Sequence, residues 1–305
     1  MTNWLWLLVL AALWSPSFLF IKVALQDVPP LTLASARLTL AAVILYVVLR
    51  LNGQNLPKSW AVWRKFFFMG FFANALPFAL FSIGELVADS GMAAILNGTT
   101  PIFTVILAHL FISDERLTAQ KIGGVLVGFV GIVLLFLPQV GGGAPLKGAG
   151  GLGLLAFTIA AISYGVGIVY ARHNLRGLPP LVGPTTQLMM ASAYLLPVAL
   201  LVERPFHLSP GMPALGSVLA LAVFGTALAF IIYYRLIERA SATFLSLVTY
   251  ILPPAGVALG VIFLNEAPGW NALAGCFLIV LGVMVVNGVV GTVWQRLFQP
   301  AALQA

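Results

Sequence analysis

Leu13-Trp14-Ser15-Pro16 begins a segment that ends in Pro29-Pro30, and Ser163-Tyr164-Gly165-Val166 begins a similar segment that ends in Pro179-Pro180. In both segments an apolar run is followed by a basic residue and a short linker. A second match relates residues 90–115 to residues 241–266, each an apolar run with a proline near its middle and an acidic residue at its end. The sequence therefore contains two copies of one pattern, about 150 residues apart.

The composition indicates a membrane protein. Hydrophobic residues make up 61% of the 305 residues and charged residues only 8%, whereas a soluble domain carries about a quarter charged residues. The pI of 9.9 does not indicate nucleic-acid binding, because the basic residues are distributed over the segments between the apolar runs. Cys276 is the single cysteine, which excludes an intramolecular disulfide.

Ten apolar stretches are long enough to cross about 30 Å of hydrocarbon. We expect spans at residues 3–21, 31–50, 64–84, 91–112, 119–137, 150–171, 181–202, 212–234, 241–264 and 270–291. Residues 1–20 lack a basic start and carry a long apolar run, so we interpret them as a retained first span rather than a signal peptide.

Each copy contains five spans, and an odd number places the second copy upside down relative to the first. The expected fold is an all-α integral membrane protein of ten transmembrane helices in two inverted five-helix repeats. We place the first repeat at residues 1–140, a Gly-rich linker at 141–149 and the second repeat at 150–305. Inverted repeats that meet near the bilayer midplane are typical of alternating-access transporters.

The basic residues predict the orientation in the membrane. The side of the N-terminus receives 11 of them: Arg50, Lys58, Arg64, Lys65, Arg116, Lys121, Arg172, Arg176, Arg235, Arg239 and Arg296. The other side receives 3, which are Lys22, Lys147 and Arg204. Because Lys and Arg are enriched in cytoplasmic loops, we expect a multi-pass membrane protein with both termini in the cytoplasm.

Arg37 is the clearest ionisable residue within a span, about 10 Å from the end of the second span at 1.5 Å per residue. It could anchor a substrate carboxylate or phosphate. Alternatively, it could extend towards the membrane surface or pair with Glu85 or Asp27, and this structural role is the favoured interpretation. The equivalent position in the second copy is the uncharged Gln187.

No span carries an acidic residue near its middle. A carboxylate contested by proton and substrate is the usual requirement of proton antiport, so we expect facilitated or exchange transport. The sequence contains no carboxylate pair for a metal, no HExxH motif and no Ser-His dyad at a shared depth. We therefore expect no catalytic residue, no metal and no cofactor.

Neutral polar and aromatic side chains recur at helical spacing in spans three, four, eight and nine, and Trp14 and Tyr164 occupy matching positions in spans one and six. The candidate substrate-binding residues are Trp14, Phe78, Phe81, Ser82, Asn97, Thr100, Tyr164, Phe230, Tyr234, Thr249 and Tyr250. The same stripes include Asn74, Thr104, Thr226, Tyr233, Ser246 and Pro253. Each residue could instead serve helix packing, but the set together favours the lining of a cavity at the repeat interface.

Spans five and ten carry glycines at the spacing of helix–helix contacts. These are Gly124, Gly128 and Gly131 in the first copy and Gly275 and Gly282 in the second. Because the pattern recurs at the same place in both copies, it favours a close contact between the two spans over a chance abundance of glycine.

The order of these features resembles the drug/metabolite transporter superfamily, in its EamA-type branch. The residues that carry the resemblance are Pro101, Asp114, Glu115, Gly123, Gly124, Gly128 and Gly131, and then Pro253, Pro254, Glu266, Gly275 and Gly282. Within the superfamily the chain is most similar to the YddG-type bacterial exporters of aromatic and neutral amino acids, which implies a location in a bacterial inner membrane. The resemblance implies a central cavity between spans one, three, four, six, eight and nine. The small multidrug resistance relatives carry a glutamate in the first span, which this chain lacks.

The expected function is export of aromatic or neutral amino acids, or similar small metabolites, through a central aromatic cavity. Aromatic walls would hold the ring of the substrate, and Asn97, Thr100 and Thr249 could bind its carboxylate. The alternatives are a broad exporter of apolar drugs or metabolites and, from another class, a channel or membrane enzyme. The expected partners are a small-molecule substrate and the lipid bilayer, with no nucleic acid, and the protein is expected to be a monomer or weak homodimer.

Overall fold

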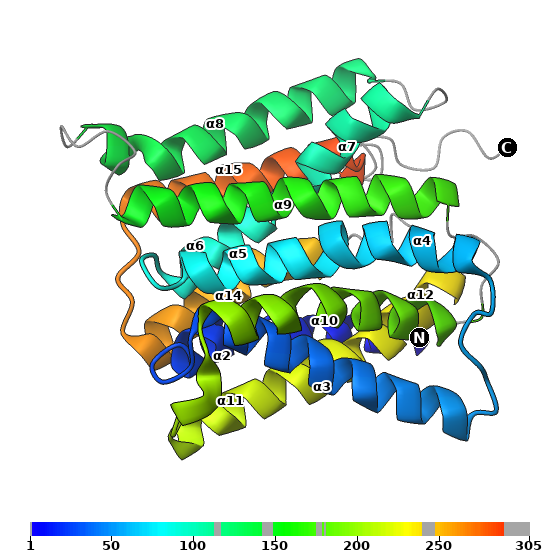
Figure 1. Cartoon of the computed structure of the whole chain (residues 1–305). Helices are drawn as coiled ribbons and strands as arrows, with labels where there is room; N and C mark the ends of the chain where they lie inside the picture. The colour runs from blue at the N-terminus through cyan, green and yellow to red at the C-terminus, as the bar shows by residue number, and fades with distance from the viewer. Residues whose placement is uncertain are drawn as a thin grey trace, which may run out of the picture.

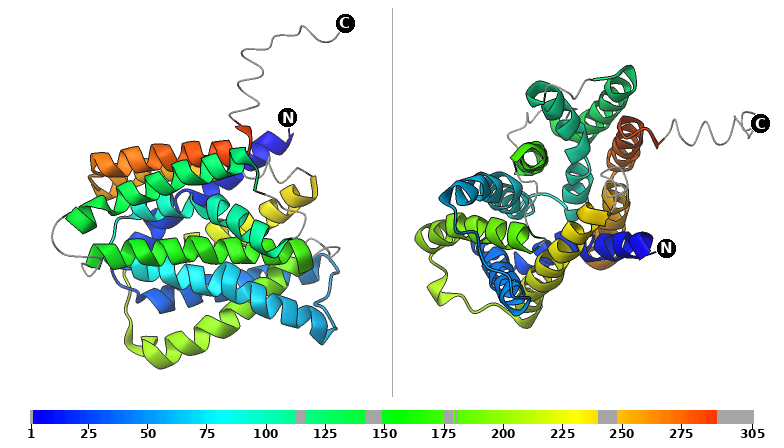
Figure 2. Two further views of the ribbon diagram at one scale, coloured as in Figure 1. Left: turned by 90° about the horizontal axis from the view of Figure 1, so that it is seen from above. Right: turned by 90° about the vertical axis from the view of Figure 1, so that its right-hand side faces the viewer.

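The structure is a computed structural model of the chain, and it describes residues 2–112, 117–141, 149–174, 179, 181–239 and 248–289. These residues form a bundle of helices with no strand among them (Figure 1). Figure 2 shows that most of the long helices run up or down one common direction, as the spans of a membrane protein do.

The first half of the chain contains five spans, three of which are interrupted. Its helices are α1 (Thr2–Trp14), α2 (Ser17–Ala24), α3 (Pro30–Leu51), α4 (Trp60–Gly70), the π-helical η1 (Phe71–Ala75), α5 (Leu76–Gly84), α6 (Ser90–Asn97), α7 (Thr100–Phe111) and α8 (Ala119–Gly141). Span one is α1 with α2, span three is α4 with η1 and α5, and span four is α6 with α7.

The second half repeats this order. Its helices are α9 (Ala149–Asn174), α10 (Val182–Val202), the short 3₁₀-helix η2 (Pro205–His207), α11 (Met212–Ala222), the π-helical η3 (Val223–Leu228), α12 (Ala229–Arg239), α14 (Val248–Leu264) and α15 (Trp270–Val286). Span eight is α11 with η3 and α12. The π-helical turns of spans three and eight therefore lie at equivalent places in the two copies.

The helices have the length and composition that membrane spans require. Among the described residues, eight helices are long and apolar enough to cross a membrane, and α14 and α15 are shorter apolar helices in the places expected for spans nine and ten. The predicted start of span nine, residues 241–247, lies outside the described residues. Span ten ends earlier than expected, since α15 stops at Val286 and Gly288 follows with φ +75°.

The helices α8 and α15 meet along a seam of glycines. A Cβ atom at Gly124 would lie 2.6 Å from the carbonyl oxygen of Gly282, and one at Gly131 would lie 2.8 Å from that of Gly275. Gly131 and Gly282 are equivalent residues of the two copies, as are Gly124 and Gly275, so each contact is the counterpart of the other. The order of the contacts shows that the two helices run antiparallel.

Two further pairs of equivalent spans also pack antiparallel, which are spans four and nine and spans two and seven. Gly91 and Gly98 of span four contact Val257 and Pro253 of span nine. In spans two and seven, Thr32 near the start of α3 is hydrogen-bonded to Glu203 at the end of α10. The expected all-α membrane fold of ten helices in two inverted repeats is confirmed.

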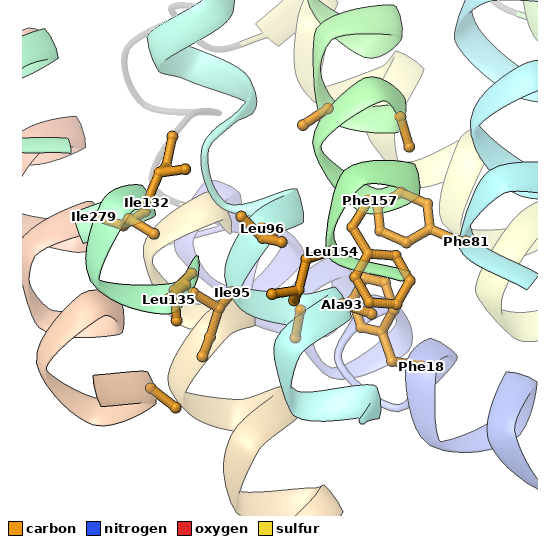
Figure 3. Packing of buried hydrophobic residues seen from close by; sticks show 14 of the residues in the cluster. Phe18, Phe81, Ala93, Ile95, Leu96, Ile132, Leu135, Leu154, Phe157 and Ile279 are labelled. Atoms are coloured by element: carbon orange, nitrogen blue, oxygen red, sulfur yellow. The ribbon is translucent and has the colours of Figure 1, made fainter. Parts of the chain in front are cut away.

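Buried apolar side chains join the repeats where interrupted and continuous spans meet. Phe18 of α2, Phe81 of α5 and Phe157 of α9 lie together in one cluster (Figure 3), with ring centroids 5.4 Å apart for Phe18 and Phe81 and 5.5 Å apart for Phe81 and Phe157. Gly84 directly contacts the ring of Phe157, so that α5 and α9 approach closely. Such close packing matters because lipid provides no hydrophobic driving force between helices.

Candidate functional site

The interruptions of the helices gather at mid-depth. Pro16 lies between α1 and α2, and the break between α6 and α7 comes just before Pro101. Proline supplies no backbone N–H and therefore breaks the helical ladder. At one break a hydroxyl replaces the missing donor, because Thr100 Oγ1 donates to the carbonyl of Asn97, four residues before Pro101, at 2.8 Å. Ser15 Oγ and Thr99 Oγ1 also donate within their own turns, to the carbonyls of Ala11 at 2.7 Å and Leu96 at 2.6 Å. Irregular backbone of this kind is tolerated in a membrane only where protein or a cavity surrounds it.

The two π-helical turns receive polar side chains from the opposite repeat. Arg37 Nε of α3 donates to Thr226 Oγ1 of η3 at 2.7 Å. Gln187 Nε2 of α10 donates to Asn74 Oδ1 of η1. Arg37 is the counterpart of Gln187, and Asn74 is that of Thr226, so the two bonds are the same contact made once in each half. π-Helical turns are frequent at functional sites.

The two contacts differ in charge. The Arg37 guanidinium lies over the ring of Phe78, 4.2 Å from its centroid, and its Nη2 donates to the carbonyl of Gly225 at 3.3 Å. Its hydrogen-bond partners are thus neutral, and it pairs with neither Glu85 nor Asp27. Neither carboxylate oxygen of Glu85 has a hydrogen-bond partner, while Asp27 accepts from the backbone N–H of Gly211 at 2.8 Å.

Aromatic rings around these bonds also form two equivalent pairs. Trp14 of α1 contacts Tyr233 of α12 with centroids 5.5 Å apart, and Tyr164 of α9 contacts Phe81 of α5 with centroids 6.1 Å apart. Trp14 and Tyr164 are counterparts in the two copies, as are Phe81 and Tyr233. Such pairs stabilise a structure by about 0.5–1.5 kcal/mol beyond the burial of their area.

Six of the predicted site residues surround the π-helical turns. Phe230 and Tyr234 lie on α12 with centroids 6.4 Å apart, and the Tyr234 hydroxyl donates to Gln187 Oε1 at 3.0 Å. Trp14, Phe78, Phe81 and Tyr164 complete the group through the contacts above. Ser82 is buried on α5, directly after Phe81.

The other four predicted residues lie on spans four and nine. Asn97 is the last residue of α6, and the Thr100 hydroxyl donates to its carbonyl at 2.8 Å. Thr249 lies in the first turn of the described part of α14. Tyr250 faces α15, where its hydroxyl donates to the carbonyl of Val283 at 3.3 Å and accepts from Asn287 Nδ2 at 2.7 Å.

Sequence reasoning did not assign Gln187 or Ser17 to the site. Ser17 Oγ is buried and has no hydrogen-bond partner. Gln187 could have been found by exchanging each residue of the Arg37–Thr226 pair for its counterpart in the other copy. Ser17 has no comparable signal, because its position depends on the kink at Pro16.

Charged side chains tie the helices together at the end of the bundle opposite the N-terminus. Lys22 Nζ donates to the carbonyls of Glu85 and Ala88, the latter at 2.8 Å. The Glu266 carboxylate accepts from the backbone N–H groups of Ser90 at 2.8 Å and Gly91 at 3.0 Å, at the start of α6. A carboxylate at a helix N-terminus satisfies free N–H groups and the helix dipole.

Glu85 is the exception at this end. Its side chain is 0% exposed, and neither carboxylate oxygen has a hydrogen-bond partner. Burial raises the pKa of this carboxyl well above its usual range; Lys22 opposes the shift, Glu266 adds to it and Arg37 opposes it.

The profile of the EamA-like transporter family matches the chain twice, at residues 2–137 and 151–288. The chain belongs to the EamA-like transporter family. Its members are membrane transporters and not enzymes. The two matches correspond to the two five-helix copies.

Several relatives of this EamA-like chain bear names as transporters. A transporter of Archaeoglobus fulgidus is 25% identical over 290 residues, which cover 94% of this chain and 99% of the relative. The inner membrane transporter YedA of Escherichia coli K12 is 26% identical over 293 residues, or 96% and 91% of the two chains. PecM of Dickeya dadantii is 28% identical over 279 residues, or 90% and 89%.

The fold is also found in a crystal structure. That structure has a TM-score of 0.68 and 22% identity, and the match covers 95% of this chain and 98% of the other. The EamA-like chain therefore shares its whole architecture with a solved protein.

Proposed function

We propose that this EamA-like transporter exports aromatic and neutral amino acids, or similar small metabolites, from a bacterial cell by alternating access. The site would lie between the π-helical turns η1 and η3, where the two repeats meet. The observation that carries the proposal is the pair of equivalent ring contacts, Trp14 with Tyr233 and Tyr164 with Phe81. They present aromatic surface from both repeats beside the interrupted spans.

The chemistry of the site favours small substrates with a ring or an apolar side chain. Its walls are Phe, Tyr and Trp rings, and its polar groups are mostly neutral amides and hydroxyls. An aromatic ring can stack on such walls, and an ammonium group can lie against a ring face. Doubly anionic substrates such as sugar phosphates usually require several converging Lys or Arg side chains, which this region does not offer among its described residues.

The symmetry of the contacts supports alternating access. Residues 1–140 and 150–305 would act as the two moving repeats, joined by the linker at 141–149, most of which lies outside the described residues. Two equivalent repeats can exchange their conformations, so that a central site opens to one side and then to the other. Without an acidic residue at mid-depth, we propose facilitated or exchange transport by a monomer or weak homodimer.

Counterflow in proteoliposomes tests this function. Purified protein is reconstituted with unlabelled amino acid inside, and uptake of labelled phenylalanine, tryptophan, leucine, alanine and lysine is followed. The proposal expects saturable counterflow that is strongest for the aromatic and large neutral substrates. Uptake that neither saturates nor responds to internal substrate would indicate a channel, and chemically altered substrate would indicate an enzyme.

A broad exporter of apolar drugs is the second candidate. The large share of ring surface in the site favours it, because apolar walls discriminate weakly among apolar ligands. Competition by hydrophobic drugs as strong as that by phenylalanine would identify this function.

A further inference from the structure

Arg37 holds a positive charge in the interior, and the hydrogen bonds of its guanidinium to the described residues all go to neutral groups, although the Glu85 carboxyl acts on it electrostatically. The residue is 7% exposed, and its guanidinium contacts a hydroxyl, a backbone carbonyl and an aromatic ring. A buried charge is costly unless it is paired, and charged residues within membrane spans usually mark a functional pathway. Because all of these contacts are neutral, the positive charge of Arg37 is available to an anion.

The second repeat shows that the fold does not need this charge. Gln187 makes the equivalent contact to Asn74 through an uncharged amide. A side chain that only bridges α3 to η3 could therefore be a glutamine. The arginine in one half alone indicates a task that the scaffold itself does not explain.

A second, independent group faces the same point. Ser17 is 7% exposed and its Oγ has no hydrogen-bond partner. A Cβ atom at Gly225 would lie 3.0 Å from Ser17 Oγ and 3.7 Å from Arg37 Nη2. Because Gly225 has no side chain, the Ser17 hydroxyl and the Arg37 guanidinium both approach the same point of η3, where even a methyl group would crowd Ser17 Oγ.

Other groups considered for an anion are already engaged. Lys22 Nζ donates to the carbonyls of Glu85 and Ala88 at the end of α5. The Thr100 hydroxyl donates to the carbonyl of Asn97. Arg37 and Ser17 are the donors that lie together beside Gly225.

We propose that Arg37 and Ser17 bind the carboxylate of the transported substrate beside Gly225, between the kink of span one and the π-helical turn η3. The proposal rests on the proposed function, and it makes the free carboxylate a requirement for recognition. A planar guanidinium suits a carboxylate because it can donate two parallel N–H bonds. Trp14 ends α1 just before the kink, so a ring on the substrate can reach the Trp14–Tyr233 pair.

The test compares ligands that differ only at the carboxylate. Binding of phenylalanine and of phenylalaninamide to purified protein is measured by calorimetry. Wild type is expected to bind phenylalanine more tightly. Arg37→Gln places the residue of the equivalent position and is expected to weaken phenylalanine about 10- to 100-fold, since hydrogen bonds to charged groups contribute about that factor. The same variant should change the affinity for phenylalaninamide by no more than about threefold.

The control is Arg50→Gln, the same change at the exposed end of α3, which should bind both ligands as wild type does. Wild type that prefers neither ligand, or Arg37→Gln that keeps full affinity for phenylalanine, would overturn the assignment. If Arg37→Gln does not fold, the binding of phenylalanine to Ser17→Ala and to Gly225→Ala is measured instead. The first removes a donor and the second places a methyl group between the two donors, so each is expected to weaken the binding of phenylalanine at least about fivefold. Unchanged binding in both variants would refute the site.

The failure of the proposed function is separate. If no amino acid is bound or transported, that function is wrong. The carboxylate site is then judged by thermal stabilisation with phenylacetate against phenylacetamide. Stabilisation by phenylacetate alone, lost in Arg37→Gln, supports the site, and equal effects of the two probes overturn it.

Discussion

Lys22 donates a hydrogen bond to the main-chain carbonyl of Glu85, while the carboxylate of the same Glu85 is buried without a hydrogen-bond partner. The backbone of Glu85 is thus hydrogen-bonded to a cation, while its carboxylate has no hydrogen-bond partner. The charged groups that act on this carboxylate are Lys22, Glu266 and Arg37. Burial is the largest influence, and it favours the protonated form.

Glu85 is expected to make the folded protein less stable as pH rises. Its raised pKa means that the folded state holds a proton that the unfolded chain has lost above the ordinary value of 4.5. Stability therefore falls from that pH up to the raised pKa and is constant beyond it. Glu85→Gln removes the effect, so its advantage in melting temperature over wild type should grow as the pH rises above 4.5.

Asp89, on the same turn, serves as the comparison. Burial raises its pKa as well, with Glu266 adding to the shift and Lys22 opposing it, but the residue is exposed. Asp89→Asn should show the same dependence of melting temperature on pH, relative to wild type, but with a smaller change. A constant difference between wild type and Glu85→Gln at all pH values would contradict the account.

Gly124→Ala should destabilise the protein, whereas Gly123→Ala should not. A Cβ at position 124 would lie 2.6 Å from the backbone of α15, while one at position 123 would have no atom within 4 Å. We expect a loss of about 1–3 kcal/mol for the first and a gain of up to about 1 kcal/mol for the second, because alanine favours a helix over glycine. Thermal unfolding in detergent measures both, and equal effects would mean that the seam is not close-packed.

Trp14→Ala and Tyr164→Ala should weaken aromatic substrates more than alanine. Losing one ring that stacks on a substrate costs about 1–3 kcal/mol, or about five- to 150-fold in affinity. Transport by purified variants, normalised for folded protein, gives the ratio of phenylalanine to alanine. Trp60→Ala, at a ring that is 73% exposed, is the control. Normal ratios in both site variants would exclude these rings from the site.

Both termini are expected in the cytoplasm, from the excess of Lys and Arg on the N-terminal side. A reporter fused after Ala305 should be active only if it functions in the cytoplasm. Activity of a reporter that needs the periplasm would contradict the orientation.

The spans and their repetition could be predicted from the sequence because length and hydropathy suffice to define a membrane helix. The matching prolines and glycines then gave the correspondence of the two copies. The pairing of α8 with α15 followed from glycine spacing alone, since only small residues allow such an approach. The predicted ring positions Trp14 and Tyr164 also followed from that correspondence.

The π-helical turns and the partners of Arg37 could not be predicted. The extra residue of the π-helical turn in η1 or η3 does not change the hydropathy pattern of the sequence. The position of such a turn depends instead on which side chains of the other repeat contact it. Glu85 and Asp27 were expected near Arg37 from depth alone, but depth does not say which face of a helix a neighbour occupies. Thr226 is the partner that the structure gives.

The seam of α8 and α15 has the geometry of an isologous interface within one polypeptide. In such an interface residue i of one subunit meets j of the other, and j meets i; here Gly124 meets Gly282 and Gly131 meets Gly275. Each repeat supplies one copy of the same surface, as two identical five-helix chains of opposite orientation would. A substitution at one glycine therefore disturbs the packing of both repeats. The second substitution that best compensates for it is expected in the other half of the chain.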